Sequence, residues 1–421
     1  MPARTPLPAA NPGAGIDYKL FLDCIHCGLC LSSCPTYEEL GTEMDGPRGR
    51  IYLMRAVTDG RLALDADVRR HLDLCLDCRA CESACPSGVQ YHKLVEPFRI
   101  ALERNEPKPL PSWIHRFALR HIFPYARRSR FALAPARLLQ RLGLDRWLLK
   151  LLPKNLRTMQ AMLPRLEPHP GRLPELLPAE GTRRARVALF TGCVADAVYP
   201  QTNWNTARVL QKNGCDVVVP LSQGCCGALA YHAADEKTAS QLATANCAAF
   251  DLDSIDAIIT NAAGCGAHLK EYGHLLPDVS AAKLAAKTRD ISEFLIELGP
   301  IAPTLPLCLT ATYHDACHLA HGQKVRLPPR QLLEMIPELK LVPLSESELC
   351  CGAAGSYNLT EPEMSERLGR RKAEHILASG AAAVFTGNVG CLMQVTRYIH
   401  ESRPDFWVAH PIDALAKSYF G

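Results

Sequence analysis

The sequence lacks any long apolar run, and neither sign of charge dominates it. No stretch approaches the roughly 18 uninterrupted apolar residues of a membrane-spanning helix. Lys and Arg number 47 against 43 Asp and Glu, a net charge of +4 that is too small to indicate nucleic-acid binding. The opening residues MPARTPLPAANPGAGIDY have no charged start followed by an apolar core, so they do not resemble a secretory signal. With 48% hydrophobic residues in 421, we expect a cytoplasmic protein of several domains.

Nucleotide-binding motifs are also missing. No G-x-G-x-x-G follows an expected strand, and no P-loop is present. The segment Gly264-Cys265-Gly266 lacks the third glycine of the dinucleotide motif. We therefore expect neither flavin nor NAD on this chain.

Cysteine, in contrast, is abundant. The chain has 19 cysteines, in a dense group at positions 24 to 85 and a dispersed group at 193 to 391. In a reducing compartment such numbers favour metal or redox chemistry over disulfides. The spacing of each group indicates which chemistry.

The dense group contains the same motif twice. Cys24-x2-Cys27-x2-Cys30-x3-Cys34-Pro35 is repeated as Cys75-x2-Cys78-x2-Cys81-x3-Cys85-Pro86. In such runs three thiolates hold one [4Fe-4S] cluster and the fourth holds the neighbouring cluster. This predicts two ligand sets: Cys24, Cys27, Cys30 and Cys85 for cluster 1, and Cys75, Cys78, Cys81 and Cys34 for cluster 2. Zinc is the weaker alternative because it favours two separated cysteine pairs.

Helical patterns surround these runs. IYLMRAVTDG, which follows Asp45-Gly46-Pro47-Arg48-Gly49-Arg50, and DADVRRHLDLCLDC are both expected to be helices. We therefore predict an all-α double-cluster ferredoxin domain at residues 1–110. Arg48 and Arg50 could donate to cluster sulfurs or to a partner's carboxylate, or could be solvated turn residues.

A basic, proline-rich segment follows at residues 111–182. Between Trp113 and Leu166 it carries twelve Lys or Arg against the single acid Asp145. Its apolar positions, including Trp147 and Leu148, form short amphipathic pieces separated by prolines. Such a segment could lie on the cytoplasmic face of the inner membrane, or act as a linker or a seat for a partner subunit.

The dispersed group is an internal duplication. Matching cysteines are separated by 124, 125, 125 and 126 residues. The first unit, residues 183–300, contains Cys193, Cys225, Cys226 and Cys265, and the second unit, residues 301–421, contains Cys317, Cys350, Cys351 and Cys391. Chance does not produce this register.

Short β patterns precede these cysteines in both units. ARVALF, CDVVVP and DAIIT in the first unit correspond to LTATY, LKLVPL and AAVFTG in the second. Each unit is thus expected to be an α/β domain whose four cysteines converge at the carboxyl edge of a sheet. They could bind an iron–sulfur cluster, bind zinc, form a transient vicinal disulfide or be plain buried cysteines, and we favour an iron–sulfur or other redox site.

Other residues near these positions have weaker signals. His268, His314 and His318 could be metal ligands, could support ligands, or could be structural. Cys215, Cys247 and Cys308 fall outside the repeat and are expected to be small core residues.

The two ferredoxin runs, the Asp45–Arg50 segment and the paired Cys-Cys-Gly units closely resemble the iron–sulfur subunit of bacterial glycolate oxidase. The tandem units are similar to the cysteine-rich domains of heterodisulfide reductase, of anaerobic glycerol-3-phosphate dehydrogenase and of lactate-utilisation proteins. In the heterodisulfide reductase pattern each unit ends in Cys-x2-Cys. Here Ala262 and Asn388 replace the first of those cysteines, so a four-thiolate site is the more compatible expectation.

The resemblance implies an electron-transfer subunit that does not itself oxidise substrate. Its implied partners are an FAD-containing, glycolate-oxidising subunit and a further flavoprotein-like subunit, with a membrane quinone as one acceptor. Two alternatives stay open: a subunit of a lactate or glycerol-3-phosphate dehydrogenase, and a thiol–disulfide reductase that uses Cys225-Cys226 or Cys350-Cys351.

Overall fold

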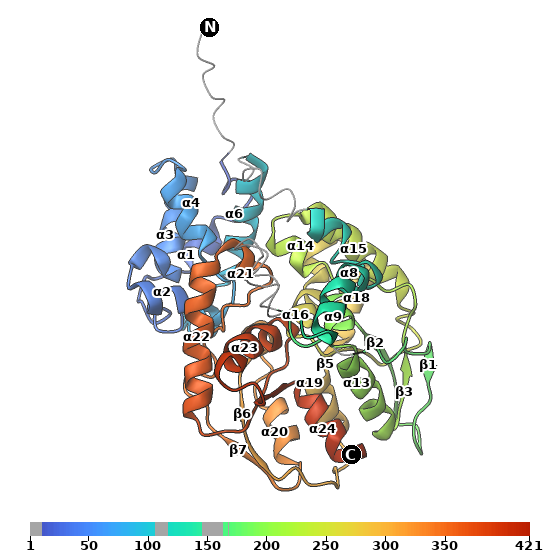
Figure 1. The fold of residues 1–421 in the computed structure, drawn as a ribbon. Helices are drawn as coiled ribbons and strands as arrows, with labels where there is room; N and C mark the ends of the chain where they lie inside the picture. Colours follow the sequence, from blue (N-terminus) through green and yellow to red (C-terminus); the bar gives the residue numbers. More distant parts are fainter. Residues whose placement is uncertain (1–10, 106–116, 145–162, 167) are drawn as a thin grey trace.

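The computed structural model describes residues 11–105, 117–144, 163–166 and 168–421. Figure 1 shows an N-terminal group of helices in blue beside two α/β units, one in green and yellow and one in orange and red. This arrangement of a cysteine-run domain followed by two α/β units agrees with the sequence prediction. Within the described ranges, no helix has both the length and the apolar character to cross a bilayer.

The N-terminal part is built from short helices around the cysteine runs. Their first residues explain where several begin: Pro35 and Pro47 occupy first-turn positions, and the Asp65 side chain accepts from Val68 N at 2.9 Å. Phe21, Met54, Leu72, Leu94 and Phe98 form their shared core. The elements are α1 (Lys19–Leu22), α2 (Pro35–Leu40), η1 (Glu43–Asp45), α3 (Pro47–Thr58), α4 (Ala66–Asp73), α5 (Ala80–Ser83) and α6 (His92–Asn105).

The described part of the basic segment lies against the first α/β unit. Helices α8 (Ala126–Ala132) and α9 (Ala134–Arg141) are short, and Arg130 pairs with Asp196 of the unit at 3.7 Å. Arg120 likewise pairs with Asp235. These two cations therefore have acidic partners within the chain. The amphipathic piece with Trp147 and Leu148 lies outside the described residues.

The first unit contains a five-stranded sheet of order β1-β3-β2-β4-β5. Its strands are β1 (Leu176–Leu177), β2 (Ala185–Phe190), β3 (Cys215–Val218), β4 (Ala257–Thr260) and β5 (Thr288–Asp290). All neighbours are parallel except β1 with β3. The helices are α12 (Val194–Val198), α13 (Pro200–Lys212), α14 (Ala228–His232), α15 (Glu236–Ala249), α16 (Ala263–Lys270), α17 (Tyr272–Leu275), α18 (Val279–Lys287) and α19 (Ile291–Leu298).

The second unit repeats this sheet in the order β7-β6-β8-β9, with all strands parallel. Its strands are β6 (Leu309–Tyr313), β7 (Leu339–Val342), β8 (Ala383–Phe385) and β9 (Trp407–Ala409). Its helical elements are η2 (His318–Gly322), α20 (Pro328–Glu334), α21 (Tyr357–Thr360), α22 (Pro362–Ala378), α23 (Val389–Ser402) and α24 (Pro411–Phe420). Strands β3, β2, β4 and β5 of the first sheet correspond in order to β7, β6, β8 and β9 of the second sheet. This shared strand order confirms the duplication.

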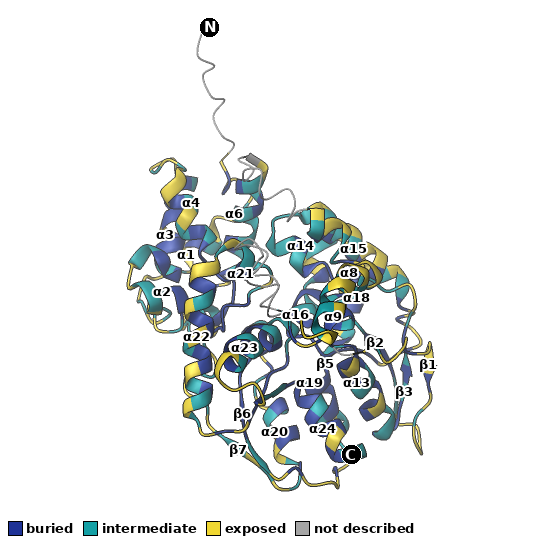
Figure 2. Cartoon of the chain, viewed as in Figure 1, coloured by how far each residue is buried: buried dark blue, intermediate teal, exposed yellow. Residues whose placement is uncertain are grey.

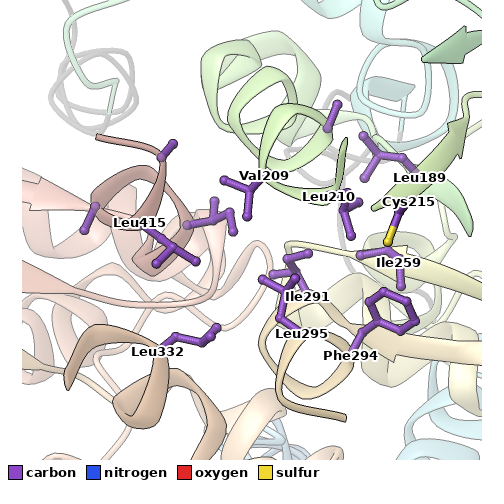
Figure 3. Packing of buried hydrophobic residues seen from close by; sticks show 14 of the residues in the cluster. Leu189, Val209, Leu210, Cys215, Ile259, Ile291, Phe294, Leu295, Leu332 and Leu415 are labelled. Atoms are coloured by element: carbon purple, nitrogen blue, oxygen red, sulfur yellow. The ribbon is translucent and has the colours of Figure 1, made fainter. Parts of the chain in front are cut away.

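One hydrophobic core joins the two units. Figure 3 shows Val209 and Leu210 of α13 and Leu295 of α19 in one cluster with Leu332 of α20 and Leu415 of α24. Figure 2 shows these inner helix faces as buried, while the outer faces are exposed. The units are therefore packed together over an apolar interface.

The N-terminal helices are fixed to the second unit by polar contacts. Arg367 and Arg371 of α22 pair with Glu39 of α2 at 3.0 and 2.9 Å, and Tyr357 Oη donates to Leu74 O at 2.8 Å. Figure 1 shows α22 alongside α2. These contacts hold the cysteine runs against the sheet units.

Candidate functional site

Four cysteines of the predicted cluster 1 surround one cavity. Cys24, Cys27, Cys30 and Cys85 line it, together with Cys81, and it encloses about 410 Å³ of empty space. Cys27 is exposed, whereas the other four are partly buried. The cavity therefore lies at the surface of the N-terminal helices.

The four cysteines of the predicted cluster 2 surround a second cavity. Cys34, Cys75, Cys78 and Cys81 line about 310 Å³ of empty space, and the first three are buried. Pro47, Cys81 and Tyr91 line both cavities, so the two adjoin. The fold thus brings Cys34 of the first run to the cysteines of the second run, and Cys85 of the second run to those of the first.

Burial favours the protonated thiol at three of these cysteines, Cys30, Cys78 and Cys81. It raises the pKa of Cys30 to about 11, and it raises those of Cys78 and Cys81 well above the usual range. Thiolate ligands must be deprotonated, so a bound cationic centre has to supply the compensating charge. Apolar cavities lined by four sulfurs fit an iron–sulfur cluster.

Arg48 and Arg50 have different roles. Arg48 lines the first cavity, pairs with Glu43 at 2.5 Å and donates to His26 O at 3.0 Å. Arg50 is 1% exposed and places Nη1 3.8 Å from Cys34 Sγ. The hypothesis of a sulfur donor is therefore supported for Arg50, whereas Arg48 already pairs with an acid of its own chain.

The first unit brings its four repeat cysteines together at the carboxyl ends of β2, β3 and β4. Cys193 Sγ lies 3.1 Å from Cys225 Sγ. Hydrogen bonds from Cys193 and then Cys226 lower the pKa of Cys225 well below its ordinary value. Contacts with Cys225 and Cys265 raise the pKa of Cys226.

The second unit forms a matching group with a histidine beside it. Hydrogen bonds with Cys350 and then Cys391 lower the pKa of Cys351, while contact with Cys317 raises that of Cys350. His314 Nδ1 lies 3.0 Å from Ser347 O, a carbonyl that can only accept, so the neutral ring presents a bare Nε2. His314 Nε2 has no hydrogen-bond partner among the described residues. One nitrogen of the ring lies within 4.8 Å of the sulfurs of Cys351 and Cys391.

Asn388 and Ala262 stand where the similar family pattern has a further cysteine. Asn388 Nδ2 donates to Cys391 Sγ at 3.6 Å, whereas the buried Ala262 offers no polar atom on its side chain. The two units therefore differ chemically, because only the second has an amide and an imidazole against its sulfurs.

The remaining candidates are placed as follows. His268 is buried between Tyr231 and Tyr272, and burial lowers its pKa to about 3. His318 Nε2 lies 3.2 Å from Asp77 O. Cys215 is a core residue, as expected. The expectation is wrong for Cys308: this residue directly precedes β6, its side chain is exposed, and its thiol donates to the Glu338 carboxylate at the surface.

The second cavity adjoins the second unit. Cys78 packs in one buried cluster with Cys317 and Cys350. After burial, the Cys317 sulfur is the largest influence that raises the pKa of Cys78. Sequence reasoning missed this junction because nothing in the spacing relates positions 78 and 317.

Apolar side chains gather on the surface beside the first cavity. Leu22, Ile25 and Leu29 are 51%, 68% and 61% exposed, and they flank the exposed Cys27. Large apolar side chains grouped at a surface commonly mark an interaction site.

Comparisons with known protein families match most of this architecture. A 4Fe-4S dicluster domain matches residues 21–89, and a cysteine-rich domain matches residues 187–270 and 311–396. A third family, described as the linker region of the glycolate oxidase iron–sulfur subunit, matches residues 110–163. These matches indicate iron–sulfur clusters in this chain.

Several curated proteins are similar over long stretches. The "Probable glycolate oxidase iron-sulfur subunit" of Bacillus subtilis is 42% identical over 90% of this chain and 89% of its own length. The glycolate oxidase iron–sulfur subunit of Escherichia coli is 36% identical over 87% and 88%. Lactate utilization protein A of Shouchella clausii is 32% identical over 54% of this chain and 98% of its own. The chain therefore belongs to the glycolate oxidase iron–sulfur subunit family and is a subunit of an oxidoreductase.

Proposed function

We propose that this chain is the electron-transfer subunit of a flavin-dependent glycolate dehydrogenase complex. A partner flavoprotein oxidises glycolate to glyoxylate, taking two electrons and two protons, and this chain delivers the electrons to a membrane quinone or another acceptor. A further flavoprotein-like subunit completes the complex. The observation that carries the proposal is the pair of adjoining cysteine-lined cavities.

The proposed ligands follow the lining of those cavities. Cys24, Cys27, Cys30 and Cys85 hold one [4Fe-4S] cluster, and Cys34, Cys75, Cys78 and Cys81 hold the other. When bound, such clusters accept and release one electron at a time. Cys81 lines both cavities, and we place it in the second set because it belongs to the Cys75-Cys78-Cys81 triplet.

The direction of transfer follows from exposure. Cys27 lies at the surface amid Leu22, Ile25 and Leu29, where a flavoprotein could dock, whereas Cys78 is buried against Cys317 of the second unit. Electrons thus enter at the Cys27 side and leave toward the cysteine-rich units, residues 183–300 and 301–421. The proposed N-terminal domain spans residues 1–110. The basic segment, residues 111–182, is proposed to contact the cytoplasmic face of the inner membrane, with a linker or a seat for a partner subunit as the alternatives.

A second function is favoured by the close sulfurs of the first unit. The separation of 3.1 Å between Cys193 and Cys225 and the lowered pKa of Cys225 suit thiol–disulfide exchange. Reduction of a small disulfide by the isolated chain would support this alternative. The related lactate utilization protein A makes lactate the alternative substrate of the partner.

The first test is the content of iron and acid-labile sulfide in protein purified without oxygen. About eight irons per chain would correspond to two cubane clusters only, and about twelve to sixteen to further clusters in one or both units. Fewer than about four would contradict the proposal.

The second test replaces one proposed ligand. Cys78→Ser should leave reduction of the partner's flavin by glycolate unchanged and abolish reduction of the acceptor, with a loss of about four irons per chain. Cys308→Ser, an exposed cysteine outside both cavities, is the matched control. Acceptor reduction at the wild-type rate in Cys78→Ser would contradict the proposed route.

A further inference from the structure

A second group of ligand-type side chains lies between the N-terminal helices and the first unit. Asp77 lies in the turn between Cys75 and Cys78, Glu96 in α6, and His232 at the end of α14. One carboxylate or ring atom from each lies within 4.8 Å of the others. Ligand atoms held about 2.0–2.2 Å from one ion lie at most about 4.4 Å apart, so a shift of well under 1 Å would place all three on a single ion.

Asp77 is a buried acid whose oxygens are not satisfied. The residue is 4% exposed, and neither Oδ1 nor Oδ2 accepts a hydrogen bond of good geometry. His232 Nδ1 lies 3.4 Å from Asp77 Oδ2 as an ion-pair contact, and this buried nitrogen has no hydrogen bond of good geometry. Burying a polar group without a well-formed hydrogen bond costs on the order of 2–7 kcal/mol, so the single contact of Asp77 with His232 leaves carboxylate oxygens that a cation could satisfy.

The neighbouring cations are engaged elsewhere. Arg99 donates to the backbone oxygens of Leu72, Asp73 and Cys75. Arg79 pairs with Glu82 at 3.3 Å and with Glu271. Among the residues that the structure describes, no guanidinium is therefore hydrogen-bonded to Asp77.

The surroundings also orient the ligands. The His318 ring stacks on that of His232, with centroids 5.4 Å apart and planes 3° from parallel, and His318 Nε2 lies 3.2 Å from Asp77 O. Outer contacts of this kind commonly fix metal-binding side chains. A cavity lined by Asp77, His232 and His318 leads to the group and leaves room for further ligands such as water.

We propose that Asp77, Glu96 and His232 bind one divalent cation of the Mn²⁺, Fe²⁺ or Zn²⁺ class. Two carboxylates and an imidazole suit these ions, whereas softer metals prefer the thiolates elsewhere in the chain. The ion ties the Cys75–Cys78 turn and α6 to α14, and so it fixes the N-terminal helices against the first unit. The site is distinct from the cysteine groups and does not depend on the proposed electron route.

Mn²⁺ is the appropriate probe because it avoids thiolate sites and its free form is observed by electron paramagnetic resonance. The full-length, iron-loaded protein is treated with a mild chelator without oxygen and titrated with Mn²⁺. We expect saturation at one Mn²⁺ per chain. Absence of saturable binding, with only weak adsorption at the surface, would overturn the proposal.

Two variants and a control locate the ion. Glu96→Gln and His232→Gln should each weaken Mn²⁺ binding by at least about tenfold, and Glu103→Gln, on the same helix α6, should not. Iron content is measured in every sample. If Glu96→Gln loses iron, the Mn²⁺ affinity of His232→Gln is used to test the assignment instead. Unchanged Mn²⁺ affinity in an iron-replete variant of either ligand would contradict the assignment.

Discussion

Arg50 is among the largest side chains that the fold encloses completely. Its guanidinium donates to His71 O at 2.7 Å and Thr36 Oγ1 at 3.0 Å, and it lies 3.9 Å from the Asp45 carboxylate. Its contact with Cys34 brings positive charge to a proposed cluster ligand. A cation and a hydrogen bond at a ligand sulfur stabilise the reduced, more negative cluster.

The variant Arg50→Gln should therefore lower the reduction potential of the cluster assigned to Cys34. A change of about 1.4 kcal/mol corresponds to about 59 mV for one electron, and we expect a shift of that size or smaller. Redox titration followed by electron paramagnetic resonance measures it. Arg48→Gln, beside the other cavity, should leave this potential in place, and an equal shift in both variants would refute the assignment.

At the scale of elements, the loop from Leu22 to Leu29 joins the first cavity to the surface. Its exposed apolar residues are not members of the core cluster of the described N-terminal helices. A protein partner would bury them together with the edge of the proposed cluster.

Replacing Ile25 by Glu should weaken binding of the flavoprotein partner by about 30-fold, the effect of a 2 kcal/mol hot-spot residue. Ile25 lines the first cavity, so iron content and the visible spectrum are measured in the same samples, and the comparison uses protein with its full iron content. Surface plasmon resonance with the purified partner measures the affinity. Val279→Glu, at an 84% exposed position of α18, is the control, and equal binding by both variants would exclude this surface.

The elements differ in how far the sequence predicts them. The six β patterns before the repeat cysteines match strands β2, β3, β4, β6, β7 and β8. Strands β4 and β8 are buried and largely apolar, whereas β6 and β7 alternate apolar with polar residues, and both patterns are typical of strands. The sequence does not predict strands β5 and β9, because Thr288–Asp290 is polar and Trp407–Ala409 leads to no cysteine of the repeat. Sites differ in the same way.

The spacing of the motifs predicts which cysteines lie together. It cannot predict that Asp77 and His232 are neighbours, because these residues meet only through tertiary packing.

At the scale of the whole molecule, the two α/β units share one core. Leu415 of α24 is 1% exposed and belongs to the same cluster as Val209 of α13 and Ile259 of β4. Asp413 of α24 also accepts from Thr202 and Asn205 of α13 at 3.0 and 2.9 Å. The duplicated units should therefore unfold as one body.

Leu415→Ala tests this coupling. Emptying a buried leucine site costs about 2–5 kcal/mol, and we expect the loss to appear in both units. Hydrogen exchange should show reduced protection in β2 and β4 of the first unit as well as in β6 and β8. Leu327→Ala, at a 67% exposed position, is the control. Loss of protection confined to the second unit would mean that the units are independent.

The exchange of cysteines between the two runs sets an order of events during biosynthesis. Cys34 lies with the second run and Cys85 with the first, so the second cavity has its full set of sulfurs only after Cys81 has left the ribosome, and the first only after Cys85. A nascent chain that ends before Cys75 therefore completes neither proposed ligand set, although it already contains the whole first run. Both proposed clusters thus wait for the second run, and a product truncated before it carries neither.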